Sequence, residues 1–190
     1  MFTIAAQIVQ GCWITFAVVW LVAAFARKRS VYREPVSQRL RYALVLAAGY
    51  LLLAKGYKLS RPLNLRIIPA SDAVAIFAAI LCVAGLLFCF WARFTLGRNW
   101  SGTVTLKEGH ELILTGPYRL VRHPIYTGLM TMIVATMLLV GHVAGIIGAL
   151  IVFAGFWMKA SYEEAVMVQQ FGEEYVAYRR RVKGIVPYLV

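Results

Sequence analysis

Acidic residues are scarce in this chain of 190 residues, which has 8 Asp and Glu against 20 Lys and Arg. In a soluble protein, such an excess of positive charge suggests a nucleic-acid partner. Here the basic residues stand between long uncharged runs, so no contiguous soluble basic domain is present to carry a nucleic acid. We therefore expect no nucleic-acid partner, and we assign the positive charge to the flanks of membrane helices, where it faces anionic lipid.

Cysteine is also scarce, and the three cysteines, Cys12, Cys82 and Cys89, all lie inside apolar runs. Their spacing fits no zinc site, and their odd number does not suggest a disulfide framework. We expect them to be small buried hydrophobic side chains. A metal held by His110 and His123 is disfavoured for the same reason, since their spacing matches no standard ligand pattern. We expect no metal.

The chain has no internal repeat, no low-complexity segment, and no basic residue ahead of its first apolar run, which argues against a cleavable signal. Its abundant feature is apolar sequence, with 61% hydrophobic residues and a mean hydropathy of +0.72. A soluble domain is only about 45–50% apolar on a similar count. These values predict an all-α integral membrane protein, and the length allows a single membrane-embedded domain over residues 1–190.

Five apolar segments could cross a bilayer as helices, for which about 20 residues are needed. The expected spans are residues 4–26, 40–57, 73–93, 125–140 and 143–159. The second is the least secure, because only 13 uncharged residues separate Arg41 from Lys55. Either its charged ends snorkel or the bilayer thins, or it is a core helix that does not cross. The last two form a hairpin, because one helix over residues 125–158 would be about 50 Å long.

The basic residues predict which side of the membrane each loop occupies. With five spans, sixteen Lys and Arg fall on one side and four on the other. The positive-inside rule then places the N-terminus outside and the richer side in the cytoplasm. Two polar stretches, residues 98–126 and 159–188, fall on that cytoplasmic side, where we expect them to meet and form a site. Residues 161–183 are amphipathic at helical spacing and predict a surface helix, with Gly172 as an interruption.

The first polar stretch enters a helix at Arg122, His123, Pro124, Ile125 and Tyr126. Proline is tolerated in a first helical turn, and the exposed N–H groups of such a turn can bind an anion or a ligand's polar atoms. His123 and Tyr126 add side chains that form hydrogen bonds. The same residues can also be a plain helix start with a basic membrane anchor, and both interpretations stay open on the residues alone.

The second polar stretch begins with Lys159, Glu163 and Glu164. Lys159 and Glu163 are four residues apart, so they share a helix face. They can be an ordinary ion pair beside lipid headgroups. They can also be a cation that holds an anionic substrate beside a carboxylate that holds a cofactor, since charged groups near membrane depth usually face a cavity.

The polar motifs together carry a resemblance through their order and spacing. They are Gly-His-Glu-Leu-Ile at 109–113, Gly-Pro-Tyr-Arg at 116–119, Arg-His-Pro-Ile-Tyr-Thr-Gly at 122–128, Glu-Glu at 163–164 and Phe-Gly-Glu-Glu-Tyr at 171–175. Residues 100–188 resemble the C-terminal half of the isoprenylcysteine carboxyl methyltransferase family, including its prokaryotic members. The N-terminal half of the chain is similar only in its apolar spans.

The resemblance implies S-adenosyl-L-methionine as the methyl donor. It implies that the residues in contact with this cofactor are His110, Glu111, Leu112, Ile113, Tyr118, His123, Pro124, Ile125, Tyr126 and Glu163. Lys159 stands where the eukaryotic enzymes have a substrate-binding arginine, and Thr103 stands where they have a cofactor-contacting glutamine. Lysine keeps the charge but loses bidentate recognition of a carboxylate. We assign catalysis to Arg122 and Lys159, which would orient the acceptor, and to Glu163, which would hold the cofactor.

The expected activity is methyl transfer to the carboxylate, or a similar nucleophile, of a lipophilic substrate such as a prenylated cysteine or a lipid. We expect this at the cytoplasmic face of a prokaryotic inner membrane, as the resemblance implies. A carboxylate is already ionised at neutral pH and needs no strong base, whereas an amine acceptor needs a proton sink, for which His123 or a glutamate could serve. The alternatives are a phospholipid, amine or thiol methyltransferase, an NADPH-dependent reductase of the same superfamily, and a non-catalytic membrane scaffold.

Overall fold

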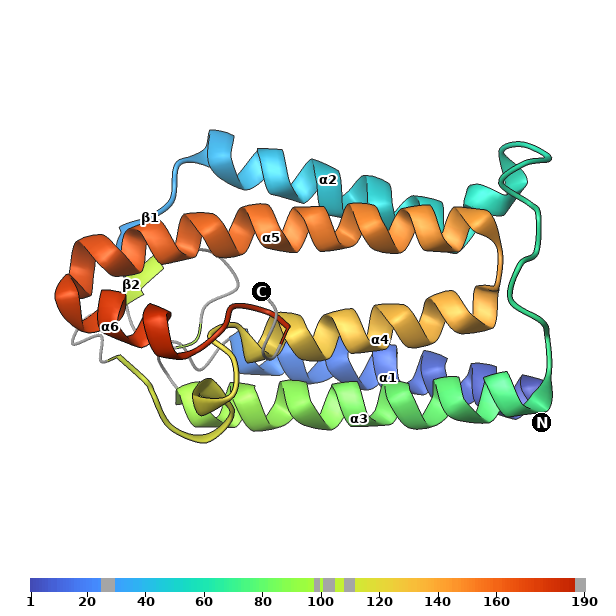
Figure 1. Ribbon diagram of the computed structural model, residues 1–190, viewed down its shortest axis with the longest axis horizontal. Helices are drawn as coiled ribbons and strands as arrows, with labels where there is room; N and C mark the ends of the chain where they lie inside the picture. Colours follow the sequence, from blue (N-terminus) through green and yellow to red (C-terminus); the bar gives the residue numbers. More distant parts are fainter. Residues whose placement is uncertain (25–29, 98–99, 101–104, 108–111, 187–190) are drawn as a thin grey trace.

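The computed structural model describes residues 1–24, 30–97, 100, 105–107 and 112–186. Within these residues the chain folds into five long helices that lie side by side, followed by one short helix (Figure 1). The long helices are α1 (Phe2–Ala23), α2 (Val36–Lys55), α3 (Asp72–Leu96), α4 (Pro124–Val140) and α5 (Val143–Phe171), and the short one is α6 (Glu173–Arg181). The predicted all-α membrane protein is confirmed.

Three of the described helices, α1, α3 and α5, are long and apolar enough to cross a membrane. Helix α4 is also apolar but shorter, with 17 residues. Helix α2 has 20 residues and includes Arg39, Arg41 and Lys55, which is why its sequence is a weak span signal. At 1.5 Å per residue, α2 is about 30 Å long, which matches the hydrocarbon thickness.

Helix starts and breaks lie at the residues that local chemistry favours. The Ser71 hydroxyl accepts a hydrogen bond from the Val74 backbone N–H at 3.3 Å and caps α3, as expected of a serine at this position. The hairpin between α4 and α5 turns at Gly141, which has a φ of 68°. This left-handed conformation is easy only for glycine, and the turn separates the last two expected spans as predicted.

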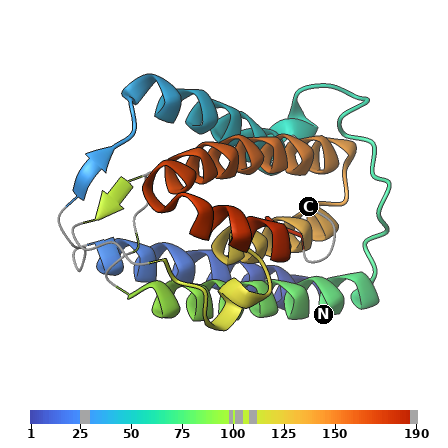
Figure 2. The ribbon, with the colours of Figure 1, turned by 60° about the vertical axis from the view of Figure 1, so that its left-hand side comes forward.

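Helix α5 continues beyond the expected span limit at residue 159 and ends at Phe171. The first part of the stretch expected to be a separate amphipathic helix therefore prolongs α5, because no proline or glycine interrupts residues 156–171. The break comes at Gly172, as expected, where a φ of 54° turns the chain into α6. Figure 2 shows α6 folded back beside the end of α5. Glu163 and Glu164 consequently lie inside a long rigid helix, near the end that carries the site.

Small residues let the helices approach closely in two pairs, α3 with α4 and α2 with α5. A Cβ atom on Gly128 of α4 would lie 2.5 Å from the Cys89 sulfur and 2.7 Å from the Gly85 carbonyl oxygen of α3. A Cβ atom on Gly148 of α5 would lie 2.5 Å from the Leu53 backbone nitrogen of α2. Close packing of small residues is a main source of helix association in membranes, and here it fixes α4 and α5, the two helices that carry the site.

Two clusters of buried apolar side chains hold the bundle together. One includes Cys12 and Cys82 and lies among α1, α3 and α4. The other includes Cys89 and Ile185 and lies mainly among α2, α4 and α5. All three cysteines are buried, as predicted, and none forms a disulfide.

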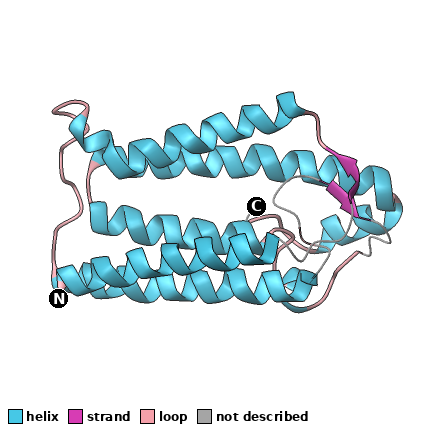
Figure 3. Cartoon of the chain, turned by 180° about the vertical axis from the view of Figure 1, so that it is seen from behind, coloured by secondary structure: helices cyan, strands magenta, loops and turns pink. Residues whose placement is uncertain are grey.

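A short antiparallel strand pair joins two distant linkers, and the sequence pattern did not predict it. Strand β1 (Ser30–Arg33) pairs with β2 (Thr105–Lys107). Figure 3 shows the pair at the end of the bundle where α5 turns into α6. The same end holds the start of α4 and the last described residues (Figure 1). The two polar stretches, residues 98–126 and 159–188, therefore meet at one end of the bundle, as expected.

Candidate active site

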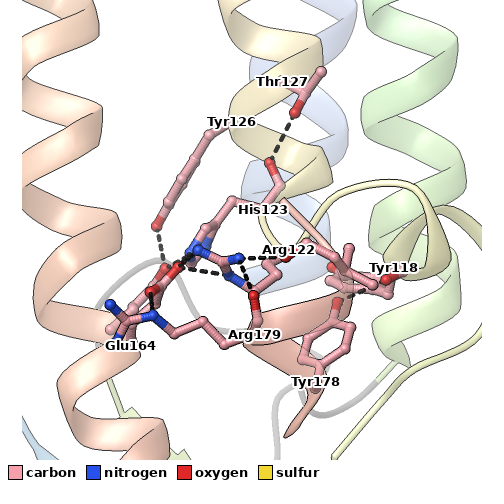
Figure 4. A network of polar contacts seen from close by, with 10 residues as sticks. Tyr118, Arg122, His123, Tyr126, Thr127, Glu164, Tyr178 and Arg179 are labelled. Atoms are coloured by element: carbon pink, nitrogen blue, oxygen red, sulfur yellow. Dashed lines mark hydrogen bonds and ion pairs between the residues drawn. The ribbon is translucent and has the colours of Figure 1, made fainter. Parts of the chain in front are cut away.

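The site is assembled from the residues that precede α4, the last two turns of α5, α6, and the segment after α6 (Figure 4). Arg122 and His123 come from the first, Glu163 and Glu164 from the second, and Arg179 from the third. Figure 4 shows Arg122, His123 and Arg179 converging on Glu164.

His123 lies between two carboxylates. Its Nε2 atom is 3.1 Å from Glu164 Oε1, and its Nδ1 atom is 3.4 Å from Glu163 Oε2. Burial of the imidazole, which is only 9% exposed, disfavours its charged form. The hydrogen bonds and charges of Glu163 and Glu164 outweigh that effect and raise the pKa of His123 above its usual value. The two carboxylates therefore favour a doubly protonated imidazolium.

Arg122 joins α5 to the segment that follows α6. Its Nε and Nη2 atoms lie 2.8 Å and 2.7 Å from Glu164 Oε1. Its Nη1 atom donates to the carbonyl oxygens of Arg179, at 3.2 Å, and Val182. The Nε atom of Arg179 lies 3.4 Å from the other oxygen of Glu164. Glu164 thus receives two guanidinium groups and one imidazole, which suits a buried carboxylate.

The backbone on either side of Arg122 is paired with residues 183–185. The N–H groups of Arg122 and His123 donate to the carbonyl oxygens of Lys183 at 2.8 Å and Gly184 at 3.0 Å. The Thr127 hydroxyl donates to the Ile185 carbonyl oxygen at 2.5 Å. The side chain of Ile185 is only 1% exposed. The chain after α6 therefore forms a wall of the site and is anchored in the core.

Glu163 belongs to a second group of side chains on the opposite side of His123. The Tyr126 hydroxyl donates to Glu163 Oε2 at 2.8 Å. The Tyr126 ring stacks on the imidazole of His123, with ring centres 5.4 Å apart and an interplanar angle of 10°. The ammonium of Lys159 lies 5.4 Å from the centre of the same tyrosine ring. Three residues singled out from the sequence, Tyr126, Lys159 and Glu163, thus meet here.

Tyr118 belongs to a short 3-10 helix, η4 (Gly116–Arg119), and is buried. Its carbonyl oxygen accepts a hydrogen bond from the Tyr178 hydroxyl at 2.6 Å. Burial and the nearby charge of Glu163 raise the pKa of the Tyr118 hydroxyl well above its ordinary value. Tyr118 is therefore a neutral hydroxyl near Glu163, on the side of the site formed by the loop before α4.

A cavity of about 230 Å³ adjoins the ion-paired group. Its lining residues are Arg122, His123, Trp157, Ala160, Ser161, Glu164, Ala165, Arg179, Gly184 and Ile185. Of the predicted cofactor-binding residues that the structure describes, only His123 lines this cavity. Tyr126 and Glu163 lie on the other side of the imidazole.

The remaining described residues predicted to bind the cofactor form no hydrogen bond or ion pair with the ion-paired group. Pro124 is buried and starts α4, as its lack of an N–H favours, while Ile125 packs against the second core cluster. Leu112 and Ile113 are half-buried. His110 and Glu111, together with Thr103, lie outside the described residues.

Glu164 and Arg179 are site residues that the sequence argument left without a role. Glu164 was noted only as the neighbour of Glu163, although adjacent helix positions point about 100° apart and so face different partners. Arg179 stands in a run of three arginines, and such a run predicts a basic surface exposed to solvent. The pairing of both with Arg122 depends on how α6 folds back, and no local pattern reports that.

The sequence was compared with protein families and with curated proteins. Residues 77–169 match the model of the isoprenylcysteine carboxyl methyltransferase family. Over these residues the chain is similar to the isoprenylcysteine carboxyl methyltransferase family. It is 31% identical over 116 residues to protein-S-isoprenylcysteine O-methyltransferase B of Arabidopsis thaliana, which covers 60% of this chain and 59% of that protein. It is 32% identical over 119 residues to protein-S-isoprenylcysteine O-methyltransferase of Rattus norvegicus, covering 57% and 42%.

A longer match is 27% identical over 172 residues to a probable protein-S-isoprenylcysteine O-methyltransferase of Oryza sativa subsp. indica, covering 89% of this chain and 87% of that protein. The chain thus spans about three fifths of the Arabidopsis protein and less of the rat protein. The part that matches the isoprenylcysteine carboxyl methyltransferase model contains the start of α4 and both glutamates. Helix α2, α6 and residues 182–185 lie outside it, although they contribute contacts to the site.

Proposed function

We propose that this protein is a membrane methyltransferase that uses S-adenosyl-L-methionine to methylate a carboxylate on a lipophilic substrate such as a prenylated cysteine. One observation carries the proposal: His123 and Tyr126, from before and within α4, meet Glu163 of α5 in direct contact. These are residues that the resemblance assigns to the cofactor, and two stretches some forty residues apart bring them together.

The chemistry of these side chains fits the proposed cofactor. The Glu163 carboxylate can accept hydrogen bonds from amino or hydroxyl groups. The Glu163 carboxylate and the aromatic rings of Tyr126 and Tyr118 provide a favourable environment for a cationic ligand. When bound, the cofactor supplies an electrophilic methyl group on a sulfonium. The chain's own part is to hold an acceptor about 3–3.5 Å from that methyl carbon and to keep water out.

The state of His123 favours a carboxylate acceptor over an amine. A carboxylate attacks as the anion and loses no proton, whereas an amine must release one. The two glutamates beside His123 raise its pKa, which favours the imidazolium form, and an imidazolium has no free nitrogen to take up a proton from an amine. In this proposal His123 holds the two glutamates in place and does not act as a base.

The two cations predicted to orient the acceptor have different surroundings. Lys159 lies beside the Tyr126 ring, on the Glu163 side of the site, and we assign it to the acceptor's anionic group. Arg122 holds Glu164 and the carbonyls of residues 179 and 182. In the proposal Arg122 contributes by keeping the wall of the site in place, which leaves the orientation of the acceptor mainly to Lys159.

The proposed orientation places the site at the cytoplasmic face of a prokaryotic inner membrane. It rests on the excess of basic residues in the loops at the site end. This side gives access to a soluble cofactor, while a lipophilic acceptor would arrive through the bilayer.

Removal of Glu163 tests the cofactor assignment. We expect Glu163→Ala to abolish S-adenosyl-L-methionine binding measured by calorimetry in detergent, with the fold kept as judged by circular dichroism. Glu173→Ala is the matched control, because Glu173 is an exposed carboxylate in α6. Affinity that is unchanged in Glu163→Ala would contradict the assignment.

The acceptor is tested with the intact protein in detergent and a labelled methyl donor. Label transferred to a prenylcysteine analogue, and not to lipid extracts, supports the proposal. Label on a phospholipid, an amine or a thiol would contradict the carboxylate acceptor and identify that compound as the acceptor. Binding of NADPH alone would indicate the reductase, and binding of neither cofactor would indicate the scaffold.

A further inference from the structure

We propose that Tyr42 of α2 is a positioning residue that holds the Lys159 ammonium against Tyr126 and thereby sets where the anionic group of the acceptor binds. The inference rests on the proposed function for the role of Lys159. It adds a residue from the N-terminal half of the chain, outside residues 77–169 that match the family model.

The Lys159 ammonium lies between two tyrosine rings. It is 5.4 Å from the centre of the Tyr42 ring and 5.4 Å from the centre of the Tyr126 ring. Both distances are within the range at which a cation is attracted to an aromatic face. Tyr42 is only 7% exposed and Tyr126 only 8%, so neither ring is a loose surface side chain.

Each of the two tyrosines is fixed at its far end by a glutamate. The Tyr126 hydroxyl donates to Glu163 at 2.8 Å, and the Tyr42 hydroxyl donates to Glu34 at 2.5 Å. Glu34 lies directly after β1 and is itself buried. The two rings are therefore held by their hydroxyl groups, and the one ammonium lies beside both.

This arrangement compensates for a property of lysine. A lysine side chain has a flexible four-carbon stem and no planar fork, so it does not fix the direction of a carboxylate by itself. Two rings from α2 and α4 restrict where the ammonium can lie. Helices α2 and α5 pack closely one turn away, where a Cβ atom on Gly155 would lie 2.8 Å from the Leu46 side chain, and this packing holds the Tyr42 ring near the stem of Lys159. Lysine can then act as a directed anchor for an anion.

The first test separates the ring of Tyr42 from its hydroxyl. With N-acetyl-S-farnesylcysteine as acceptor, we expect Tyr42→Leu to raise KM about tenfold, because a cation–π contact of this kind is lost. We expect kcat and the calorimetric affinity for S-adenosyl-L-methionine to change little. Tyr42→Phe keeps the ring and should restore most of the KM.

The matched control is Tyr50→Leu, which removes a tyrosine ring two turns further along α2. Tyr50 packs against Trp13, with ring centres 6.2 Å apart, on the part of α2 away from Lys159. An equal rise in KM in Tyr50→Leu, or an unchanged KM in Tyr42→Leu, would overturn the inference. A general loss of stability would instead lower kcat and the melting temperature of both variants.

A second readout does not depend on catalysis. The rate at which an amine-reactive acylating reagent modifies Lys159, followed by mass spectrometry, reports how well the two rings hold the ammonium. We expect this rate to rise severalfold in Tyr42→Leu and to stay near the wild-type value in Tyr42→Phe and Tyr50→Leu. An unchanged rate in Tyr42→Leu overturns the inference, whereas a wild-type protein that transfers no methyl group refutes only the proposed function.

Discussion

The two ends of the helix bundle hold their charged side chains in different ways. At the end with the site, His123 is buried, the Arg122 side chain is 11% exposed, and the two share the carboxylate of Glu164. At the other end, Arg66 is exposed and donates to the backbone carbonyls of Ile68, Leu139 and Val140 at 3.0–3.2 Å. Among the described residues, His142 at that end forms no ion pair. Its Nδ1 atom contacts the Asn64 carbonyl oxygen and its ring stacks on Tyr57.

This difference indicates a structural role for Arg66 and a functional role for the group around Glu164. Arg66 caps the C-terminal end of α4, where the carbonyls are without helical partners and a cation is favoured. That is a sufficient structural reason for its charge. Buried ion pairs contribute little net stability on average, so the group around Glu164 is better explained by what it holds in place. This contrast is why we assign function to one end only.

The largest effect is expected from Glu164→Ala. Removing this carboxylate leaves the buried charges of Arg122 and His123 without their shared partner, which costs about 3–5 kcal/mol in comparable cases. Unfolding in detergent followed by circular dichroism measures the loss. Glu174→Ala is the control, since Glu174 is exposed. Equal effects of the two substitutions would remove the distinction between the ends.

A smaller loss is expected from Arg66→Ala at the opposite end. The substitution removes three hydrogen bonds that are exposed or only partly buried, and a favourable charge at the end of α4, for a cost of about 1–2 kcal/mol. Binding of S-adenosyl-L-methionine by calorimetry should be unchanged. If Arg66→Ala abolished S-adenosyl-L-methionine binding while the protein stayed folded, the end with Arg66 would also be needed for the site.

The pH dependence of stability tests the charge of His123. The pKa of His123 is raised in the folded protein above its ordinary value of 6.5, because hydrogen bonds and charge from Glu163 and Glu164 outweigh the effect of burial. The stability that its proton contributes is therefore fully present below about pH 6.5 and is lost as pH rises through the raised pKa. The melting temperature of wild type minus that of His123→Gln should fall over this interval. A difference that stays constant would mean that His123 is neutral in the folded protein.

The smallest effect is expected from His142→Ala. His142 and Tyr57 are half-buried and the contact with the Asn64 carbonyl is exposed, so the free energy of unfolding should change by only about 0.5 kcal/mol. A loss as large as that of Glu164→Ala would contradict the assignment of His142 to a turn.

Local signals were enough to predict much of this fold. Apolar runs predicted the helices, and the excessive length of a single helix over residues 125–158 predicted the hairpin. These depend on residues adjacent in the chain. The pairing of β1 with β2 depends on linkers more than seventy residues apart, and the continuation of α5 past residue 159 depends on packing that hydropathy does not describe.

The candidate site was predictable in part for the same reason. His123, Tyr126 and Glu163 belong to motifs that the family resemblance marks, and the structure brings them together. Their roles in binding stay predictions. The sequence could not single out Glu164, Arg179 or Tyr42, because the role of each depends on a contact with a residue far away in the chain. Adjacent glutamates in particular look alike in sequence, and only the fold gives them different neighbours.

The pairing of residues 121–123 with residues 183–185 has a consequence for the order of events during synthesis. A ribosome makes the chain from its N-terminus at roughly 5–20 residues per second. Arg122 and His123 thus emerge several seconds before the carbonyl groups that receive their backbone N–H groups. All the long helices can already be in place while this wall is still missing. The site is therefore among the last parts of the protein to form.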